Sequence, residues 1–159
     1  MFLEIEHKYL VDRQSWSPSL AVRSSRILQG YLVREPKKTV RVRIKENEEG
    51  SFGFLTLKGP SSGASRAEFE YPVPAEDARF MLELFCRNVI EKTRYDVLFE
   101  GKKWEVDVFE GENAGLVVAE IELSSPDESY EKPGWIKDNV TDDPRYSNAA
   151  LSERPFRSW

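Results

Sequence analysis

The stretch Glu4-Ile5-Glu6-His7-Lys8-Tyr9-Leu10 carries a charged side chain at every second position of a segment that alternates like a β-strand. Side chains two positions apart share one face of a strand, so Glu4, Glu6 and Lys8 lie together and His7 points away from them. Two carboxylates side by side are unfavourable unless an opposite charge sits near them. This stretch therefore predicts a strand whose charged face meets other charged groups.

Same-sign pairs of this kind recur along the chain. The other pairs are Arg41 and Arg43, Glu68 and Glu70, Lys92 and Arg94, Glu105 and Asp107, and Glu120 and Glu122. The residues between the two members of each pair are nearly all apolar. A polar strand face usually faces water, but solvated faces favour threonine and mix the two signs of charge. Repetition on six strands instead favours an enclosed charged chamber.

Composition is that of a water-soluble globular protein: 159 residues, 40% hydrophobic, 32% charged and a net charge of −5. We expect a single domain over residues 1–159. The negative charge and the absence of a Lys/Arg block argue against a nucleic-acid coat protein. The single cysteine, Cys86, is expected to be a core residue, and a chain without disulfides is typical of a reducing compartment. No apolar run reaches the ~20 residues of a membrane span, and the sequence begins directly in a charged strand, so we expect a cytoplasmic protein.

Alternation and turn residues predict about eight antiparallel strands. We expect strands over residues 2–11, 26–34, 40–45, 52–58, 66–73, 89–99, 104–110 and 116–123. Residues 12–25 and 59–63 read as loops, and Gly30 indicates a bulge or a close contact. A helix over residues 74–88 would bury Phe80, Met81, Leu84 and Phe85, and a short helix should follow Ser125-Pro126. A helical turn is expected over residues 148–153.

Two architectures fit these strands. An open sheet or sandwich would leave the charged faces in water, whereas a closed barrel would turn them inward around a wet cavity, with helices outside. Turned inward, the charged faces bring together eight carboxylates and six basic side chains. The carboxylates are Glu4, Glu6, Glu68, Glu70, Glu105, Asp107, Glu120 and Glu122, and the basic residues are Lys8, Arg41, Arg43, Lys58, Lys92 and Arg94. Confined carboxylates must bind cations or protonate. Mg²⁺ or Mn²⁺ is the natural cation, and the basic side chains then favour a polyphosphate substrate.

At this point the motifs resemble the CYTH superfamily, the triphosphate tunnel metalloenzymes. The Glu4-x-Glu6-x-Lys8 signature is followed in order by Gln29-Gly30-Tyr31, Arg41-x-Arg43, Leu57-Lys58, Glu68-x-Glu70, Glu91-Lys92-Thr93-Arg94-Tyr95, Glu105-x-Asp107 and Glu120-x-Glu122. The tail Asp143-Pro144-Arg145-Tyr146-Ser147-Asn148 resembles that of short bacterial members. The resemblance implies a mainly β (α+β) fold, an eight-stranded antiparallel closed barrel with a charged tunnel and a few helices outside. It also implies a divalent metal and hydrolysis of a triphosphate.

The resemblance and the chemistry together imply roles for these residues. Metal ligands would be Glu4, Glu6, Asp107, Glu120 and Glu122; phosphate would be bound by Lys8, Arg41, Arg43, Lys58, Lys92 and Arg94; and the catalytic set would be Lys8, Lys58, Glu68, Glu70 and Glu120. Glu68 and Glu70 fit interior salt bridges equally well. His7 is expected to pack on the outer face. Arg145, Tyr146 and Asn148 are expected to help a terminal helix close one end of the barrel, which favours compact inorganic tripolyphosphate.

Other readings stay open. The same barrel could serve a class IV-type adenylyl cyclase that converts ATP to cyclic AMP and pyrophosphate, or a thiamine or nucleoside triphosphatase. A non-catalytic polyphosphate-binding module and a structural β protein are the non-enzymatic alternatives. The expected partner is a small-molecule triphosphate rather than nucleic acid or a membrane, and the sequence leaves a homodimer open.

Overall fold

The chain forms a closed antiparallel β-barrel in a computed structural model that describes residues 2–159. The barrel strands follow the order β5-β4-β3-β2-β6-β7-β8-β1, and β5 also pairs with β1, which closes the ring. The strands are β1 (Phe2–Val11), β2 (Arg23–Glu35), β3 (Lys38–Asn47), β4 (Gly50–Ser62), β5 (Ser65–Val73), β6 (Ile90–Phe99), β7 (Lys102–Phe109) and β8 (Val117–Glu122). The predicted barrel is thereby confirmed, and the open-sheet alternative is wrong.

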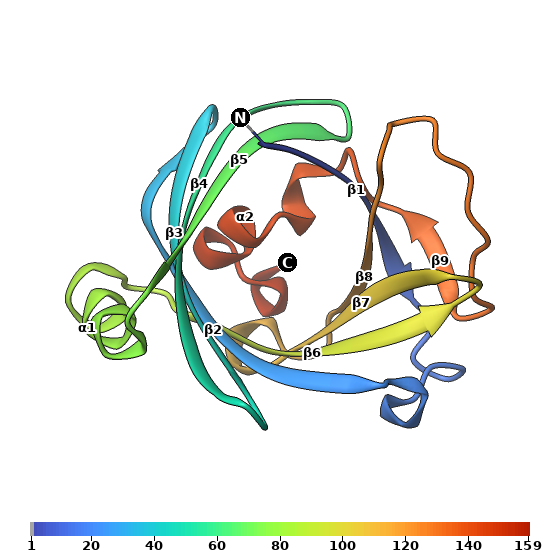
Figure 1. Cartoon of the computed structure of the whole chain (residues 1–159), viewed down its shortest axis with the longest axis horizontal. Coiled ribbons are helices and arrows are strands. Elements are labelled where there is room, and N and C mark those ends of the chain that lie inside the picture. Colours follow the sequence, from blue (N-terminus) through green and yellow to red (C-terminus); the bar gives the residue numbers. More distant parts are fainter. Residues whose placement is uncertain (1) are drawn as a thin grey trace.

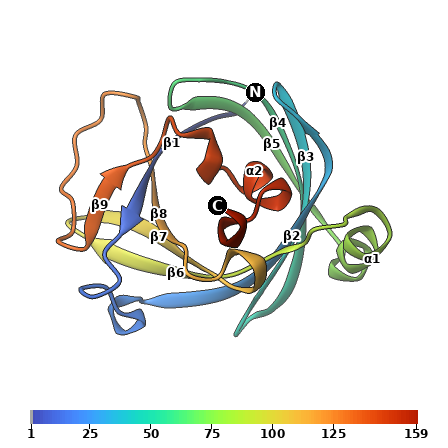
Figure 2. The ribbon, with the colours of Figure 1, turned by 180° about the vertical axis from the view of Figure 1, so that it is seen from behind.

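Helices and a ninth strand cover parts of this barrel. The helices are α1 (Ala75–Phe85) and α2 (Asn148–Glu153), with short 3₁₀ turns η1 (Pro18–Leu20), η2 (Gly111–Asn113), η3 (Pro144–Tyr146) and η4 (Phe156–Ser158). Strand β9 (Ile136–Asn139) adds to β1 outside the ring. Figures 1 and 2 show α1 outside the ring of strands, whereas α2 and the C-terminus lie within its outline from both sides. None of the helices within residues 2–159 has the length and apolar character of a membrane span.

The barrel is polar inside and apolar outside, as the strand alternation predicts. The outward residues of β1, β7 and β8 form one apolar cluster, which contains Ile5, Tyr9, Trp104, Val106, Ala119 and Ile121. Residues 123–139 cover this cluster through Leu123 and Trp135. A second cluster of Val42 and Ile44 is covered by α1. Burial of apolar surface thus holds the wall from outside and leaves the inward face free for charged side chains.

The third apolar cluster lies at one end of the tunnel, where the C-terminal segment enters. Leu151 of α2 packs with Ile90, Phe109 and Val118, and Phe156 of η4 packs against this group. These contacts bring α2 to the barrel end that carries the start of β6 and the end of β7. The helical turn predicted over residues 148–153 is therefore present.

Several local predictions were wrong. Residues 59–62 belong to β4 rather than to a loop, and a register shift between Lys58 and Ser61 absorbs Gly59-Pro60. No helix follows Ser125-Pro126, and β9 was not predicted. Helix α1 ends at Phe85 and buries Ala78 and Leu82, whereas Phe80, Leu84 and Phe85 are exposed. The reason is the close packing of α1 against β4. A Cβ added at Gly53 would lie 3.0 Å from Cβ of Ala78, so the helix residue at this contact must be small.

Candidate active site

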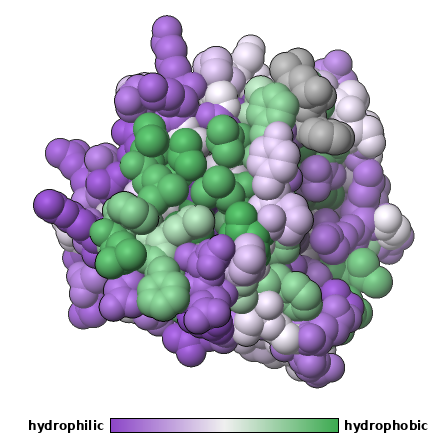
Figure 3. All heavy atoms as spheres, turned by 60° about the vertical axis from the view of Figure 1, so that its left-hand side comes forward, coloured by the Kyte–Doolittle hydropathy of each residue, from purple (hydrophilic) through white to green (hydrophobic). Residues whose placement is uncertain are grey.

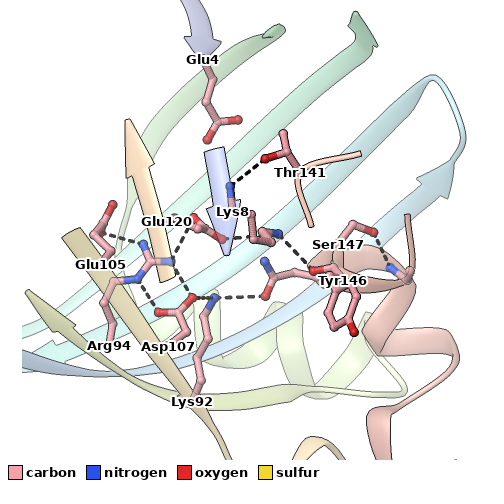
Figure 4. A network of polar contacts seen from close by, with 12 residues as sticks. Glu4, Lys8, Lys92, Arg94, Glu105, Asp107, Glu120, Thr141, Tyr146 and Ser147 are labelled. Carbon is pink, nitrogen blue, oxygen red and sulfur yellow. Dashed lines mark hydrogen bonds and ion pairs between the residues drawn. The ribbon is translucent and has the colours of Figure 1, made fainter. Parts of the chain in front are cut away.

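Strands β6, β7 and β8 build one wall of the chamber from alternating inward residues. Nζ of Lys92 donates to Oδ2 of Asp107 at 2.7 Å, and neither side chain has exposed surface. The guanidinium of Arg94 donates to both oxygens of Asp107, from Nε at 2.7 Å and from a terminal nitrogen at 2.8 Å. It also reaches Glu105 at 2.9 Å and Glu120 at 3.7 Å. Figure 4 shows these side chains converging from neighbouring strands.

The charges of this wall stabilise one another. Burial raises the pKa of Asp107, but the charges and hydrogen bonds of Arg94 and Lys92 outweigh burial, so its pKa lies well below the ordinary value. The same balance, with Lys8 and Arg94 as the cations, lowers the pKa of Glu120 to about 2. For Lys92, burial dominates despite Asp107 and lowers its pKa to about 7. Both oxygens of Asp107 are already occupied, which favours an anchoring role over metal binding.

Strand β1 contributes Glu4, Glu6 and Lys8 to the chamber. Nζ of Lys8 lies 3.5 Å from Oε1 of Glu120 and donates to the carbonyl oxygen of Tyr146 at 3.1 Å. Within residues 2–159, no basic side chain forms an ion pair with Glu6. Burial, then the negative charges of Glu120 and Glu4, raises the pKa of Glu6 to about 8. A half-buried carboxylate without an ion-pair partner is a group that a bound cation would stabilise.

The opposite wall, from β3, β4 and β5, contains the remaining predicted residues. Nζ of Lys58 lies 2.7 Å from Oε2 of Glu4 and 3.4 Å from Oε2 of Glu68. Burial raises the pKa of Glu4, but the charge and hydrogen bond of Lys58 outweigh it and leave that pKa lowered. Burial, then the charge of Glu4, raises the pKa of Glu68. Lys58 is thus shared between two carboxylates and holds β4 against β1 and β5.

The two arginines of β3 are oriented by neutral side chains that the sequence analysis did not assign to the site. Arg41 donates to Oγ1 of Thr56 at 3.2 Å and lies 3.5 Å from Glu70, while Thr56 itself donates to Glu70 at 2.9 Å. Arg43 donates twice to Oε1 of Gln29, at 2.9 and 2.6 Å. Gln29 and Thr56 are both fully buried. In the sequence, Thr56 could have been found as a polar residue two positions before Lys58 on the same strand face, whereas the neighbours of Gln29 on its strand face are Ile27 and Tyr31.

Arg43 has no carboxylate in direct contact within the described residues. Burial, then repulsion from Arg41 and Arg94, lowers its pKa to about 9. Arg43 of β3 is therefore repelled by the guanidinium groups of Arg41 on the same strand and of Arg94 on β6. An anion placed between them would relieve that repulsion.

A cavity of about 600 Å³ is lined by chamber residues together with the C-terminal segment. The chamber residues are Glu4, Glu6, Lys8 and Lys58, and the other lining groups include Arg34, residues 140–144 and α2. A second cavity, of about 330 Å³, contains Tyr31, Arg87 and Phe85 and shares Arg34 and Glu153 with the first. Tyr31, part of the Gln29-Gly30-Tyr31 motif, lies at this second cavity.

The C-terminal segment contributes directly to the chamber. Besides the Tyr146 carbonyl that binds Lys8, Oδ1 of Asn148 accepts from Nζ of Lys92 at 3.1 Å. Ser147 caps α2 through its Oγ, which accepts from the amide of Ala150 at 3.1 Å. Arg145 instead pairs with Asp143 at the surface. Tyr146 and Asn148 therefore do more than close the end, because they hold two lysines of the site.

Three further predicted residues lie as follows. Glu122 is exposed and sits opposite Glu6 in the β1–β8 register. His7 lies outside the chamber, where Nδ1 and the hydroxyl of Tyr130 are 2.6 Å apart. Glu105 lies inside and pairs with Arg94.

No three His, Cys, Asp or Glu residues within residues 2–159 converge tightly enough to form a ready metal site. Oxygen donors for a hard cation are nevertheless present in Glu4, Glu6 and Glu120, which influence one another's charge.

Comparison with known proteins identifies relatives over nearly the whole chain. The profile of the CYTH domain matches residues 3–154. An inorganic triphosphatase of Acetivibrio thermocellus is 45% identical over 157 residues, covering 98% of this chain and 97% of that protein. An inorganic triphosphatase of Nitrosomonas europaea is 33% identical over 152 residues, covering 94% and 96%. The crystal structure of the inorganic triphosphatase NE1496 superposes with a TM-score of 0.66 at 30% identity, covering 96% and 95% of the two chains.

Proposed function

The chain belongs to the CYTH domain family, and we propose that it is an inorganic triphosphatase that hydrolyses tripolyphosphate to pyrophosphate and phosphate. The observation that carries this proposal is the chamber itself, in which Arg43 has no carboxylate in direct contact and is repelled by Arg41 and Arg94. A linear chain of phosphates supplies the missing negative charge. Relatives at 45% and 33% identity that are named inorganic triphosphatase support the same substrate.

The basic residues divide into two groups by their contacts. Lys92 and Arg94 are anchored on Asp107, and Lys58 bridges Glu4 and Glu68. These anchors hold the ammonium and guanidinium groups in place before the substrate arrives, so little reorganisation is needed as charge develops on the phosphates. Arg41 and Arg43, held by Thr56 and Gln29, remain free to bind phosphate oxygens bidentately.

We assign the metal to the carboxylates of β1 and β8. Glu4 and Glu6, with Glu120 or Glu122, would hold a divalent ion, either Mg²⁺ or Mn²⁺, because oxygen ligands and an uncompensated carboxylate suit a hard cation. Such an ion, when bound, neutralises phosphate charge and lowers the pKa of water. Asp107 is assigned to anchoring Lys92 and Arg94 rather than to the metal.

The proposal also assigns catalytic roles to a lysine and three carboxylates of the chamber. Lys8 lies between Glu120 and the Tyr146 carbonyl, at a position where it would contact the terminal phosphate. Glu120 would orient the attacking water. Glu68 would hold the side chain of Lys58 in position, and Glu70 that of Arg41. The leaving pyrophosphate departs with its negative charge balanced by the basic wall.

The decisive experiment measures phosphate release from tripolyphosphate by the purified protein with Mg²⁺ or Mn²⁺. Glu4→Ala and Lys8→Ala should each abolish release, while Lys103→Ala, at an exposed position, should behave as wild type. Unchanged activity in both site variants would refute the assignment. A panel of tripolyphosphate, thiamine triphosphate, ATP and pyrophosphate separates the substrates, and cyclic AMP formed from ATP would identify a cyclase instead.

A further inference from the structure

Strand β5 carries a third charged residue on its chamber face, in addition to Glu68 and Glu70. Arg66 lies two positions before Glu68, so the two side chains share one face of the strand. The opposite face of β5 contains Phe69 and Tyr71, which are exposed on the outside of the barrel. Figure 3 shows apolar side chains gathered on the outside of the molecule, on the side where α1 lies. Arg66 therefore points inward, and it lines the cavity of about 600 Å³.

Arg66 differs from the other basic side chains that line this cavity. There are four of them among the described residues, and the other three form ion pairs with carboxylates. These pairs are Lys8 with Glu120, Lys58 with Glu4, and Arg34 with Glu153. Arg66 has no ion pair within residues 2–159, although its Cα lies opposite that of Glu4 in the β1–β5 register. Because Glu4 is paired with Lys58, the charge of Arg66 is left for an anion in the cavity.

A local irregularity of β4 holds the Arg66 side chain in place. The β4–β5 register shifts between Lys58 and Ser61, and the two residues between them are Gly59 and Pro60. Irregularities of this kind re-aim side chains beside active sites. Here the carbonyl oxygen of Gly59 accepts from Nε of Arg66 at 2.6 Å, while the two terminal nitrogens of Arg66 have no protein partner within residues 2–159. The planar guanidinium is thus oriented before any ligand binds, with its terminal N–H groups available to that ligand.

We propose that Arg66 binds the outermost phosphate of tripolyphosphate and thereby distinguishes a chain of three phosphates from a shorter one. This inference rests on the proposed function, because it concerns the same substrate in the same chamber. The inner phosphates would be held by Arg41, Arg43 and Arg94, none of which lines the cavity that contains Arg66. The two regions meet at Glu120, which lies 3.5 Å from Nζ of Lys8 and 3.7 Å from the guanidinium of Arg94. A linear anion held by the three inner arginines can therefore extend past Lys8 into the cavity.

Two features favour phosphate binding over a purely structural role for Arg66. A residue that only held the Gly59 carbonyl would need one N–H group, whereas a guanidinium presents two further nitrogens that match two oxygens of one phosphate. The cross-strand partner of Arg66 on β4 is Ser61, which lines the same cavity. Its hydroxyl is a second group that can donate to a phosphate oxygen.

Steady-state kinetics with phosphate chains of two lengths test this role. Arg66→Ala should raise KM for tripolyphosphate by about ten- to a hundredfold, as for the loss of a hydrogen bond between charged groups, and leave kcat unchanged. The inhibition constant of pyrophosphate should not change, because two phosphates held by the inner arginines do not reach Arg66. Arg66→Lys keeps the charge without the planar fork and should recover only part of the lost affinity. Arg13→Ala is the matched control, because Arg13 also donates to one backbone carbonyl, that of Gly115 at 3.3 Å, and lines neither cavity.

Thermal unfolding shows whether each variant is folded, and Arg66→Lys carries the test if Arg66→Ala does not fold. An equal rise in KM for tripolyphosphate and in the inhibition constant of pyrophosphate overturns the proposal, because Arg66 would then act on the whole chamber. An unchanged KM, or an equal effect of Arg13→Ala, also overturns it. A wild type that binds tripolyphosphate with Mg²⁺ but does not hydrolyse it refutes the proposed function alone. Calorimetric dissociation constants of the two phosphate chains then replace the kinetic constants, and the same comparison decides the role of Arg66.

Discussion

Lys92 of β6 and Asp107 of β7 lie diagonally across the two strands with Nζ 2.7 Å from Oδ2, and both side chains are completely buried. Arg94 shares the same carboxylate. Asp107→Ala would leave an ammonium and a guanidinium buried without their counter-charge. We expect it to lower the free energy of unfolding by about 3–5 kcal/mol, the cost of breaking a buried ion pair. Urea denaturation of the purified variant measures this.

A surface ion pair provides the comparison for that result. Arg23 and Glu49 lie 3.5 Å apart with more than half of each side chain exposed. Glu49→Ala should change the free energy of unfolding by less than about 1 kcal/mol. Equal effects of the two substitutions would show that Asp107 does not anchor the buried wall.

Much of this chamber is predictable from alternation alone, but closure is not. The period of two in Glu4-Ile5-Glu6 defines a strand and its charged face, and this face is indeed the inner one. The same alternation fits an open sheet equally well, because closure depends on the long-range pairing of β5 with β1. The family resemblance rather than the strand pattern resolved that choice.

Other elements escaped prediction for identifiable physical reasons. The sequence of α1 favours burial of its largest side chains, yet the helix buries Ala78 against the barrel, because Gly53 has no side chain at the contact. Strand β9 contains Lys137, Asp138 and Asn139, which are poor strand formers, and it exists because β1 offers an edge. Gln29 and Thr56 carry no charge, so a pattern of paired charges does not include them.

Gly30 permits the close approach of α1 to β2. A Cβ at this position would lie 2.6 Å from both Cβ and Sγ of Cys86 and 3.1 Å from Cδ2 of Leu82. Gly30→Ala must therefore push the end of α1 outward, and we expect a loss of about 1–3 kcal/mol in the free energy of unfolding. Gly134→Ala is the control, because nothing lies within 4 Å of its Cβ position. A Gly30→Ala protein as stable as the control would contradict this packing.

Glu6 should make the metal-free protein less stable as pH rises. Its pKa increases from 4.5 to about 8 on folding, so the folded state binds more protons than the unfolded state between these values. This contribution to stability is complete below pH 4.5 and is lost as pH rises through 8. Thermal unfolding of the apoprotein across this window should show a falling midpoint, and Glu6→Gln should flatten the curve.

Magnesium provides the second half of the Glu6 test. Metal binding requires the deprotonated carboxylate, so Mg²⁺ should raise the unfolding midpoint more above pH 8 than below it. Glu6→Gln should remove most of that increase, whereas Glu112→Gln, at an exposed position, should retain it. If the two variants respond alike to Mg²⁺, Glu6 is not a ligand.

Asn148 should support the charge of Lys92 from the C-terminal segment. Its Oδ1 accepts from Nζ of Lys92 at 3.1 Å, and the pKa of that lysine is already lowered to about 7 by burial. Asn148→Ala removes an acceptor that favours the charged lysine, so the pKa of Lys92 should fall further. We expect kcat/KM for tripolyphosphate to fall by about tenfold at neutral pH, as for the loss of one hydrogen bond to a charged group. The falling limb of the pH profile should also move to lower pH.

The control is Asn88→Ala, because Asn88 is an exposed asparagine of the second cavity, and this substitution should leave that limb in place. A change in kcat/KM with an unmoved pH limb would mean that Asn148 only holds α2 in position and does not act on Lys92.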